Sequence, residues 1–253
     1  MALFKRKSKS QAEKWNYRTM FGPNMNFAAT EAYKLLRANI MFSFSDEGEC
    51  HIVGVTSAVQ DEGKSSTVCN TAYAMAESGA KVLLLEADLR RPSIASKLGI
   101  SRVPGLTNLL VAKGNYKEMI QQCSAAPGLD ILTAGDIPPN PSELLGSNRM
   151  ARLLQELAAD YEYILVDLPP VTVVSDAVAI SKLLHGVVIV VRGGSSDRQM
   201  LAEAMRQLQL VNVRILGFVY RDNGASGSKY GKYKRYGKYK KYYSEYGKKP
   251  TKQ

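Results

Sequence analysis

One short stretch constrains this chain more than any other feature. Residues 58–65 read AVQDEGKS and follow the β-branched run HIVGVTS at residues 51–57. Residues 65–78 are rich in small side chains and stop at Gly79, as a helix does where a left-handed residue is wanted. A strand, an AxxxxGKS loop and a helix form the context of a phosphate-binding loop (P-loop), because backbone N–H groups and the helix amino end attract anions. The alternative is an ordinary turn in which Lys64 is a surface lysine.

The loop residues are the candidate contacts for a nucleotide. Gly63 allows the backbone to approach phosphate, Lys64 would reach the β- and γ-phosphates, and the Ser65 hydroxyl would ligate Mg²⁺. Ala58 stands where the strict pattern has glycine, and Asp61 brings a negative charge that should point outward or meet a cation. The predicted nucleotide-binding residues are Ala58, Val59, Gln60, Asp61, Glu62, Gly63, Lys64, Ser65, Ser66 and Arg192.

The rest of the chain alternates apolar strands with helices. Besides the strand at 51–57, strands are predicted at 81–86, 129–133, 163–167, 187–191 and 215–220. Helices are predicted at 27–44, 65–78, 142–159, 175–184 and 198–210. Continuously apolar strands that alternate with helices indicate an α/β domain, with a mostly parallel sheet covered on both faces. We therefore expect a P-loop NTPase domain at 27–223, a basic flexible arm at 1–26 and a disordered tail at 224–253.

The charge of +11 is concentrated at the two ends of the chain. Residues 226–253 hold ten Lys/Arg and one acid, and residues 1–14 hold five Lys/Arg and one acid. Basic ends favour contact with an acidic surface or partner. Three scattered cysteines without a CxxC pair fit a reducing cytosol. The sequence has neither a secretory signal nor an apolar run of the ~20 residues that span a membrane, so we expect a cytoplasmic location.

Three carboxylates fall at predicted strand ends. Glu86 and Asp88 close VLLLEADLRR, and Asp167 closes ILVD before two prolines. Ligands bind at the carboxyl ends of strands in open α/β sheets, and Mg²⁺ prefers oxygen ligands. Being two apart, Glu86 and Asp88 should project to the same side if the strand continues that far. The alternatives are ion pairs with Arg90 and Arg91, and for Asp167 a loop acid before a rigid turn.

These motifs together resemble the bacterial tyrosine kinases (BY-kinases) of capsule and exopolysaccharide assembly. EAYKLLRANI at 31–40 looks like the EX2RX2R helix of that family, SAVQDEGKSS like its Walker A motif, and LLLEADLRRP like its Walker A′ motif. PPNPSELL at 138–145 and ILVDLPP at 164–170 match two further stretches, and a tyrosine-rich end closes the set. The resemblance covers most of residues 27–253.

The resemblance implies roles for particular residues. Lys64 would contact the phosphates of ATP, and Glu86 would activate the incoming tyrosine hydroxyl. Ser65, Asp88 and Asp167 would organise Mg²⁺. The expected catalytic set is Lys64, Glu86, Asp88 and Asp167. A subunit interface that builds a homo-oligomeric ring would contain Glu31, Lys34 and Arg37.

The resemblance also implies partners. They are protein tyrosine substrates, a phosphotyrosine phosphatase and a membrane-anchored polysaccharide co-polymerase that recruits the kinase to the inner face of the plasma membrane and completes its nucleotide site.

The sequence departs from the family pattern at several places. Glu86 replaces the usual Asp, and Lys34 replaces the middle Arg and loses its bidentate geometry. Gln60 and Asp61 replace the usual Pro and Gly in the loop, and Arg221 stands where an adenine-contacting Asn is expected. The phosphate and metal site is therefore better matched than the base site.

The tail is the expected substrate of the kinase. Residues 229–249 read KYGKYKRYGKYKKYYSEYGKK, in which Gly and Lys interleave with tyrosines and leave too little apolar surface to fold. The alternative is a basic tail that binds lipid or single-stranded nucleic acid. The predicted phosphorylation sites are Tyr230, Tyr233, Tyr236, Tyr239, Tyr242, Tyr243 and Tyr246.

Two other classes share some of these features. A ParA/MinD-like positioning ATPase has the same fold, but its signature lysine at the second loop position is Val59 here, and it lacks a tyrosine cluster. A nucleic-acid-binding protein could use the basic tail, but the body offers no reading helix, and no specific nucleic acid is expected. The tyrosine kinase is the favoured hypothesis, with the ATPase switch as its alternative.

Overall fold

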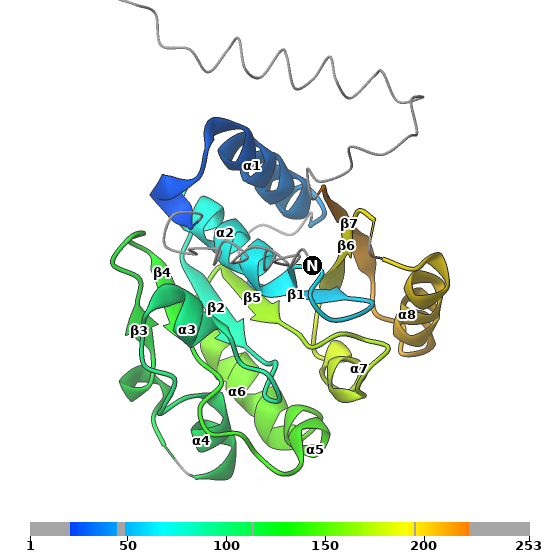
Figure 1. Cartoon of the computed structure of the whole chain (residues 1–253). Coiled ribbons are helices and arrows are strands. Elements are labelled where there is room, and N and C mark those ends of the chain that lie inside the picture. The colour runs from blue at the N-terminus through cyan, green and yellow to red at the C-terminus, as the bar shows by residue number, and fades with distance from the viewer. Residues whose placement is uncertain (1–20, 45–48, 113, 195, 223–253) are drawn as a thin grey trace, which may run out of the picture.

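A seven-stranded sheet forms the centre of the part of the chain that the computed structural model describes, residues 21–44, 49–112, 114–194 and 196–222 (Figure 1). The strand order is β3-β4-β2-β5-β1-β6-β7, and all neighbours are parallel except the antiparallel pair β3–β4. The strands are β1 (His51–Ser57), β2 (Val82–Glu86), β3 (Gln121–Gln122), β4 (Leu129–Leu132), β5 (Tyr163–Asp167), β6 (Gly186–Arg192) and β7 (Ile215–Arg221).

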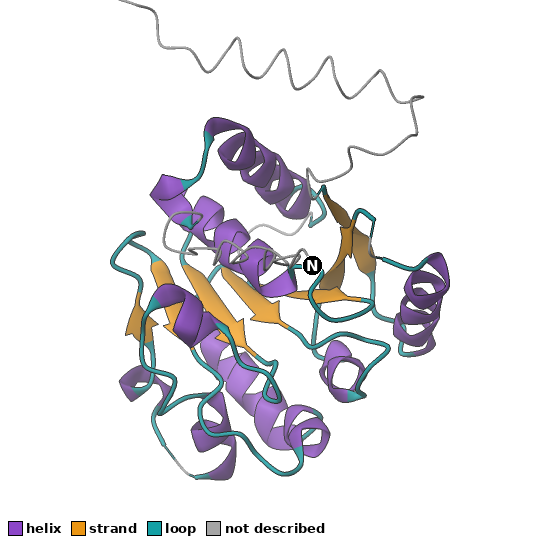
Figure 2. Cartoon of the chain, viewed as in Figure 1, coloured by secondary structure: helices purple, strands orange, loops and turns teal. Residues whose placement is uncertain are grey.

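Helices cover both faces of this sheet (Figure 2). One face is covered by α1 (Phe27–Met41), α2 (Lys64–Glu77) and α3 (Ile94–Leu98). The other face is covered by α4 (Leu106–Val111), α5 (Pro141–Leu145), α6 (Asn148–Ala158), α7 (Asp176–Ser181) and α8 (Arg198–Leu210). Two short 3₁₀ turns, η2 (Gly22–Asn24) and η3 (Tyr116–Glu118), complete the described elements. The predicted α/β class with helices on both faces is confirmed.

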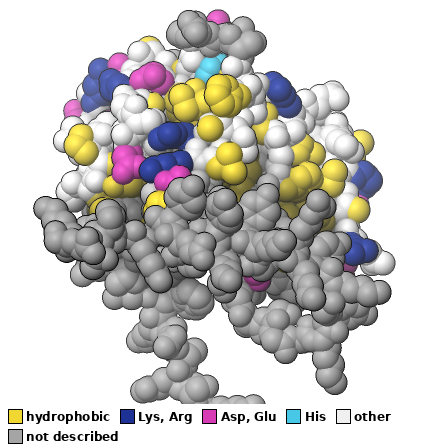
Figure 3. Space-filling view, turned by 90° about the horizontal axis from the view of Figure 1, so that it is seen from above, with side chains coloured by type: hydrophobic (Ala, Val, Ile, Leu, Met, Phe, Trp, Pro, Cys, Tyr) yellow, Lys and Arg dark blue, Asp and Glu magenta, His cyan; other side chains and the backbone are white. Residues whose placement is uncertain are grey.

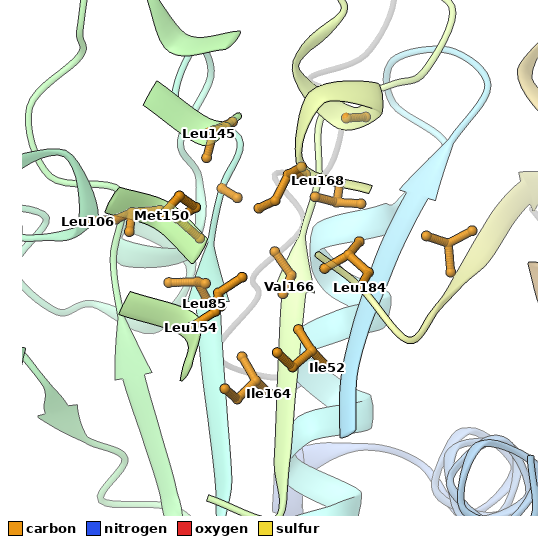
Figure 4. Close-up of a cluster of buried hydrophobic side chains, with 14 of the residues drawn as sticks. Ile52, Leu85, Leu106, Leu145, Met150, Leu154, Ile164, Val166, Leu168 and Leu184 are labelled. Carbon is orange, nitrogen blue, oxygen red and sulfur yellow. The ribbon is translucent and has the colours of Figure 1, made fainter. Parts of the chain in front are cut away.

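Each face of the sheet has its own apolar core, because the strands are buried on both sides. Toward α6, Leu85 and Val166 pack with Met150 and Leu154 (Figure 4). Toward α2, Leu84 packs with side chains such as Val68 and Met75. Burying one side chain of this size contributes roughly 1.5–3 kcal/mol. The two cores together hold the central strands in a fixed register.

The register brings the carboxyl ends of the central strands to one edge. Val55 of β1 and Glu86 of β2 both lie opposite Asp167 of β5. The loops that follow β1, β2 and β5 therefore meet at the same edge of the sheet. Open α/β sheets bind ligands at this edge.

Helix α1 packs on α2 and leaves one side open. Asn26 caps it by accepting a hydrogen bond from Ala29 N–H at 2.9 Å, and Leu36 and Ile40 join the core below. Leu35, next to Leu36 on the same helix, is 62% exposed. Viewed from the α1 side, hydrophobic side chains gather on the surface beside charged ones (Figure 3).

Residues 21–26, assigned from the sequence to the arm, pack against α2. Gly22 N–H donates to Asn70 Oδ1 at 3.2 Å, and the Phe21 ring meets the Tyr73 ring edge-on at 5.6 Å. This part of the chain therefore belongs to the folded body. The remainder of the predicted arm, residues 1–20, and the predicted tail lie outside the described residues.

The predicted strands are confirmed, and one predicted helix is wrong. The segment 142–159 forms two helices, because the chain is interrupted at Gly146 and Ser147. The Ser147 hydroxyl caps α6 by accepting from Met150 N–H at 3.2 Å. Helices α3 and α4 and strand β3 were not predicted. None of the helices in the described ranges combines the length and the apolar character needed to cross a membrane.

Candidate nucleotide and metal site

The loop between β1 and α2 has the backbone of a phosphate-binding loop. Asp61 and Gly63 both adopt positive φ, at 62° and 94°, and Lys64 opens α2. Asp tolerates this conformation better than most residues with a Cβ atom. The Asp61 side chain is exposed, and its carbonyl accepts from Arg192 Nη1 at 3.0 Å. Asp61 thus points outward and also lies next to a cation, as expected.

Several loop residues that were predicted to contact the nucleotide instead make hydrogen bonds that fix the shape of the loop. The Glu62 carboxylate is only 1% exposed and accepts from Val59 N–H at 3.1 Å and from the Ser196 hydroxyl. The Ala58 carbonyl accepts from Thr172 Oγ1 at 2.7 Å. In this geometry Glu62 and the Val59 N–H hold the shape of the loop, and Ser66 lies in the first turn of α2.

The loop is also tied to the segment after β2. Gln60 Oε1 accepts from Arg91 Nη1 at 2.8 Å, and Arg91 N–H donates to Asp88 Oδ1 at 3.1 Å. Arg91 therefore connects the P-loop to the carboxylate that the sequence predicts as a metal ligand. No sequence pattern indicated this contact.

Lys64, Asp88 and Asp167 converge at the edge of the sheet. Lys64 Nζ lies 2.7 Å from Asp88 Oδ2 and 3.5 Å from Asp167 Oδ1. The same ammonium lies 3.4 Å from Ser65 Oγ. The exposed fractions of the Lys64, Asp88 and Asp167 side chains are 12%, 6% and 0%. The structure thus brings together four of the predicted site residues: Lys64, Ser65, Asp88 and Asp167.

The charges of this cluster do not balance. Burial raises the pKa of Asp167, and the nearby Lys64 ammonium and Ser65 hydroxyl oppose that shift. Burial alone would lower the pKa of Lys64, but the fields of Asp167 and Asp88 outweigh it and raise that pKa. With both carboxylates ionised, one ammonium leaves one negative charge uncompensated. A further cation would stabilise the cluster.

A buried oxygen without a partner supports the same conclusion. Asp167 Oδ2 has no hydrogen-bond partner among the described residues. Buried polar atoms are nearly always satisfied, and an exception often marks a missing ion or water. Ser65, Asp88 and Asp167 supply hard oxygen ligands of the kind Mg²⁺ takes. The residues present therefore fit the magnesium ion of a bound nucleotide.

Glu86 lies near this cluster but makes different contacts. Its side chain is fully buried, and the carboxylate accepts from the N–H groups of Ser93 at 2.5 Å, Ile94 at 2.6 Å and Ala134 at 3.1 Å. Burial raises its pKa, and these N–H groups oppose the shift. Glu86 and Asp88 were expected to project to the same side only if the strand continued to Asp88, and β2 ends at Glu86, so that condition is not met.

An unpredicted network lies beside the site. Arg90 donates to Asp176 through Nε at 2.7 Å and Nη2 at 3.1 Å, and the Ser142 hydroxyl donates to the same carboxylate. This contact excludes the alternative in which Arg90 pairs with Glu86 or Asp88. Asp176 is fully buried, so the network joins the loop after β2 to α5 and α7. Ser142 belongs to the stretch PPNPSELL, and that motif was the one sequence pattern that could have indicated this network.

The predicted interface residues lie along α1. Lys34 Nζ and Glu31 Oε1 form an ion pair at 2.9 Å, and both side chains are partly exposed. Arg37 Nη1 donates to the Ala74 carbonyl at 2.9 Å, in the last turn of α2. Arg37 therefore has a role within the fold. The seven predicted phosphorylation sites lie outside the described residues.

The fold and this site define a P-loop nucleotide-binding protein. Consistent with that class, the family model described as "ParA: NUBPL iron-transfer P-loop NTPase" matches residues 50–238. Tyrosine-protein kinase YwqD of Bacillus subtilis (strain 168) is 37% identical over 204 residues, which cover 81% of this chain and 84% of that protein. Some curated relatives are longer, and the chain spans 28% of the length of one of them.

Solved structures show the same relation. The kinase domain of Escherichia coli tyrosine kinase ETK matches with a TM-score of 0.77 and 30% identity, covering 89% of this chain and 88% of that one. The chimerical protein CapA2B2 matches with a TM-score of 0.71 and 31% identity, covering 79% of this chain and 85% of that one. Within the P-loop NTPases, the chain belongs to the bacterial tyrosine kinase family.

Proposed function

We propose that this chain transfers the γ-phosphoryl group of ATP to tyrosines in the tail of a second copy, and that this autophosphorylation in trans regulates capsule or exopolysaccharide synthesis. The observation that carries the proposal is the cluster of Lys64, Asp88 and Asp167 beside the P-loop, with its unsatisfied Asp167 oxygen. Membership of the tyrosine kinase family and the tyrosine-rich tail support the choice of acceptor.

In this proposal, different residues of the site bind the phosphates and the magnesium ion. The P-loop N–H groups and Lys64 would hold the phosphates, while Ser65, Asp88 and Asp167 would hold magnesium. Bound MgATP would supply an electrophilic γ-phosphoryl group whose negative charge the metal offsets. The tyrosine oxygen forms the new bond to phosphorus, the bond to the ADP oxygen breaks, and the phenolic proton leaves to a carboxylate.

Glu86 is the carboxylate that the family resemblance assigns to this proton. Its side chain is fully buried and accepts three backbone hydrogen bonds, so an incoming hydroxyl can reach it only if its surroundings open. Asp88 lies closer to Lys64 and is 6% exposed.

The partners belong to the same proposal. Helix α1 is proposed to meet a neighbouring copy and build a ring, through Glu31 and Lys34 on its exposed side and through Arg37, which also bonds to α2. A membrane-anchored activator of the polysaccharide co-polymerase type is proposed to recruit the chain to the inner face of the plasma membrane from the cytoplasm. A phosphotyrosine phosphatase would reverse the modification.

The alternative is an ATPase switch of the ParA/MinD kind. It would use the same fold and metal site but transfer the phosphoryl group to water. Val59 stands at the position where that class carries its signature lysine, and its N–H is bound by Glu62. The tyrosine cluster has no role in such a switch.

Incubation of the full chain with MgATP, followed by mass spectrometry of the tail, tests the proposal. The wild type should gain phosphotyrosine between Tyr230 and Tyr246. Lys64→Met should lower the amount of phosphotyrosine by at least about tenfold, because an interaction with the transferred phosphoryl group is lost. The reaction is run with and without the cytoplasmic segment of the activator.

Two controls make the outcome specific. Lys182→Met removes an exposed lysine just after α7 and should behave as the wild type. A variant with all seven tail tyrosines changed to Phe should hydrolyse little ATP. ATP hydrolysis without phosphotyrosine, with the activator present, would refute the kinase and favour the switch.

A further inference from the structure

Arg221 is the last residue of β7 and lies at the same edge as the P-loop. The strand register pairs it with Arg192 at the end of β6, and Gly193 N–H donates to the Arg221 carbonyl at 2.8 Å. The backbone of Arg221 is thus fixed by the sheet. Its position sets where the long side chain can reach.

The Arg221 side chain lies directly against Gly63. A Cβ atom placed on Gly63 would be 1.4 Å from Arg221 Nη1 and 2.6 Å from its Cζ. A larger residue at position 63 would displace the guanidinium, which is the far end of a flexible side chain. Gly63 also has a positive φ of 94°, which favours glycine. The guanidinium packs on the loop residue that directly precedes Lys64.

Two arginines from neighbouring strands reach the same loop. Arg192 Nη1 donates to the Asp61 carbonyl at 3.0 Å, two residues before Gly63. Guanidinium groups stay charged in proteins. None of the ion pairs within the described residues involves Arg221. An anion bound at the loop would give this charge a partner.

We infer that Arg221 binds the phosphate chain of the nucleotide and adds a second cationic contact to that of Lys64. The inference rests on the proposed function only in taking a nucleotide as the ligand. Arginine can bind a phosphate through two parallel hydrogen bonds, which a neutral amide cannot reproduce. Arg221 would therefore compensate for the carboxylate that Asp61 brings to this loop.

Nucleotide binding tests this inference without any phosphoryl transfer. The full chain is titrated with a fluorescent ADP in the presence of Mg²⁺, and a non-hydrolysable ATP analogue and tripolyphosphate serve as unlabelled competitors. Arg221→Gln should weaken the binding of all three ligands by about tenfold or more, because a charge-assisted hydrogen bond is lost. The difference from the wild type should shrink at high salt, because exposed charges are screened.

Two further variants decide what kind of contact Arg221 makes. Arg221→Lys keeps the charge and should retain most of the affinity. Arg214→Gln removes an exposed arginine just before the other end of β7 and should bind as the wild type. Unfolding temperatures of all variants show whether the fold is intact.

The outcomes separate this inference from the kinase proposal. Equal affinities for the wild type and Arg221→Gln would overturn the inference and leave the kinase proposal standing. Loss of binding to ADP and to the ATP analogue but not to tripolyphosphate would also overturn it, because the contact would then be to the base. A wild type that binds no nucleotide with the activator segment present would overturn both.

Discussion

Glu86 is a fully buried carboxylate that is held by backbone N–H groups instead of by a cation. Its partners fix the start of α3 and the segment after β4 on either side of β2. The segment between Glu86 and Ser93 carries Asp88, so this carboxylate helps to position the metal site. A single side chain can thus affect both stability and binding.

We expect Glu86→Gln to lower the free energy of unfolding by about 1–3 kcal/mol, because its amide would place a donor opposite a buried N–H group. Chemical denaturation of the full chain measures this change. Glu156→Gln, on the exposed side of α6, is the matched control and should change stability by less than about 0.5 kcal/mol. Unchanged stability of Glu86→Gln would contradict the positioning role and favour a purely chemical one.

Residue patterns predicted the cluster of Lys64, Ser65, Asp88 and Asp167 but not the contacts of Glu86. The cluster follows from motifs that each lie in one short stretch, at strand ends that parallel pairing brings together. Glu86 meets Ala134, which lies 48 residues away, and that distance is closed only by the complete fold. The same holds for Arg90 with Asp176 and for Arg221 with Gly63.

Among the elements, the long ones were predictable and the short ones were not. The predicted bounds of β1, β5 and α8 agree with the structure, because each has a strong apolar pattern. Helices α3 and α4 have five and six residues, too few to form without tertiary contacts. The break at Gly146 was missed because the apolar pattern of α5 continues into α6.

The loop before β6 is joined to β1 by a histidine. His185 Nδ1 accepts from Ile52 N–H at 2.9 Å, and His185 N–H donates to the Ile52 carbonyl at 2.8 Å. Burial lowers the pKa of His185, the neighbouring His51 lowers it further, and Glu49 opposes the shift. The acceptor role requires Nδ1 to be unprotonated.

This contact gives the fold a specific pH dependence. The stability that neutral His185 contributes is fully present above its unfolded-state pKa near 6.5 and is lost as pH falls through the lower folded-state pKa. His185→Asn keeps an acceptor at the same position without titrating. Denaturation at about pH 8 and about pH 5 should show a smaller loss for this variant than for the wild type. Equal losses would show that His185 does not control the dependence.

For the whole molecule, the charge of the tail bears on the proposed assembly. The segment at 226–253 carries ten Lys/Arg and one acid, and each phosphate adds about −1.5 to −2. Two or three phosphates would offset about half of the positive charge of the tail. We propose that a ring forms while the tail is unmodified and separates after phosphorylation.

Light scattering of the full chain measures the expected change in molar mass. The wild type without MgATP should form the larger species, and so should the variant with seven Phe substitutions with or without MgATP. The phosphorylated wild type should be smaller, because the modified tail no longer binds a neighbouring site. Identical masses for the all-Phe variant and the phosphorylated wild type would rule out this mechanism of disassembly.

Helix α2 links the P-loop to helix α1, which carries the proposed subunit interface. It has 14 residues, so it is roughly 21 Å long, and it starts at Lys64. Near its other end, the Ala74 carbonyl is held by Arg37 of α1. A continuous helix that is held at both ends moves as one rigid unit. A tilt of α1 against the proposed neighbouring copy would therefore also move Lys64, the residue proposed to contact the phosphates.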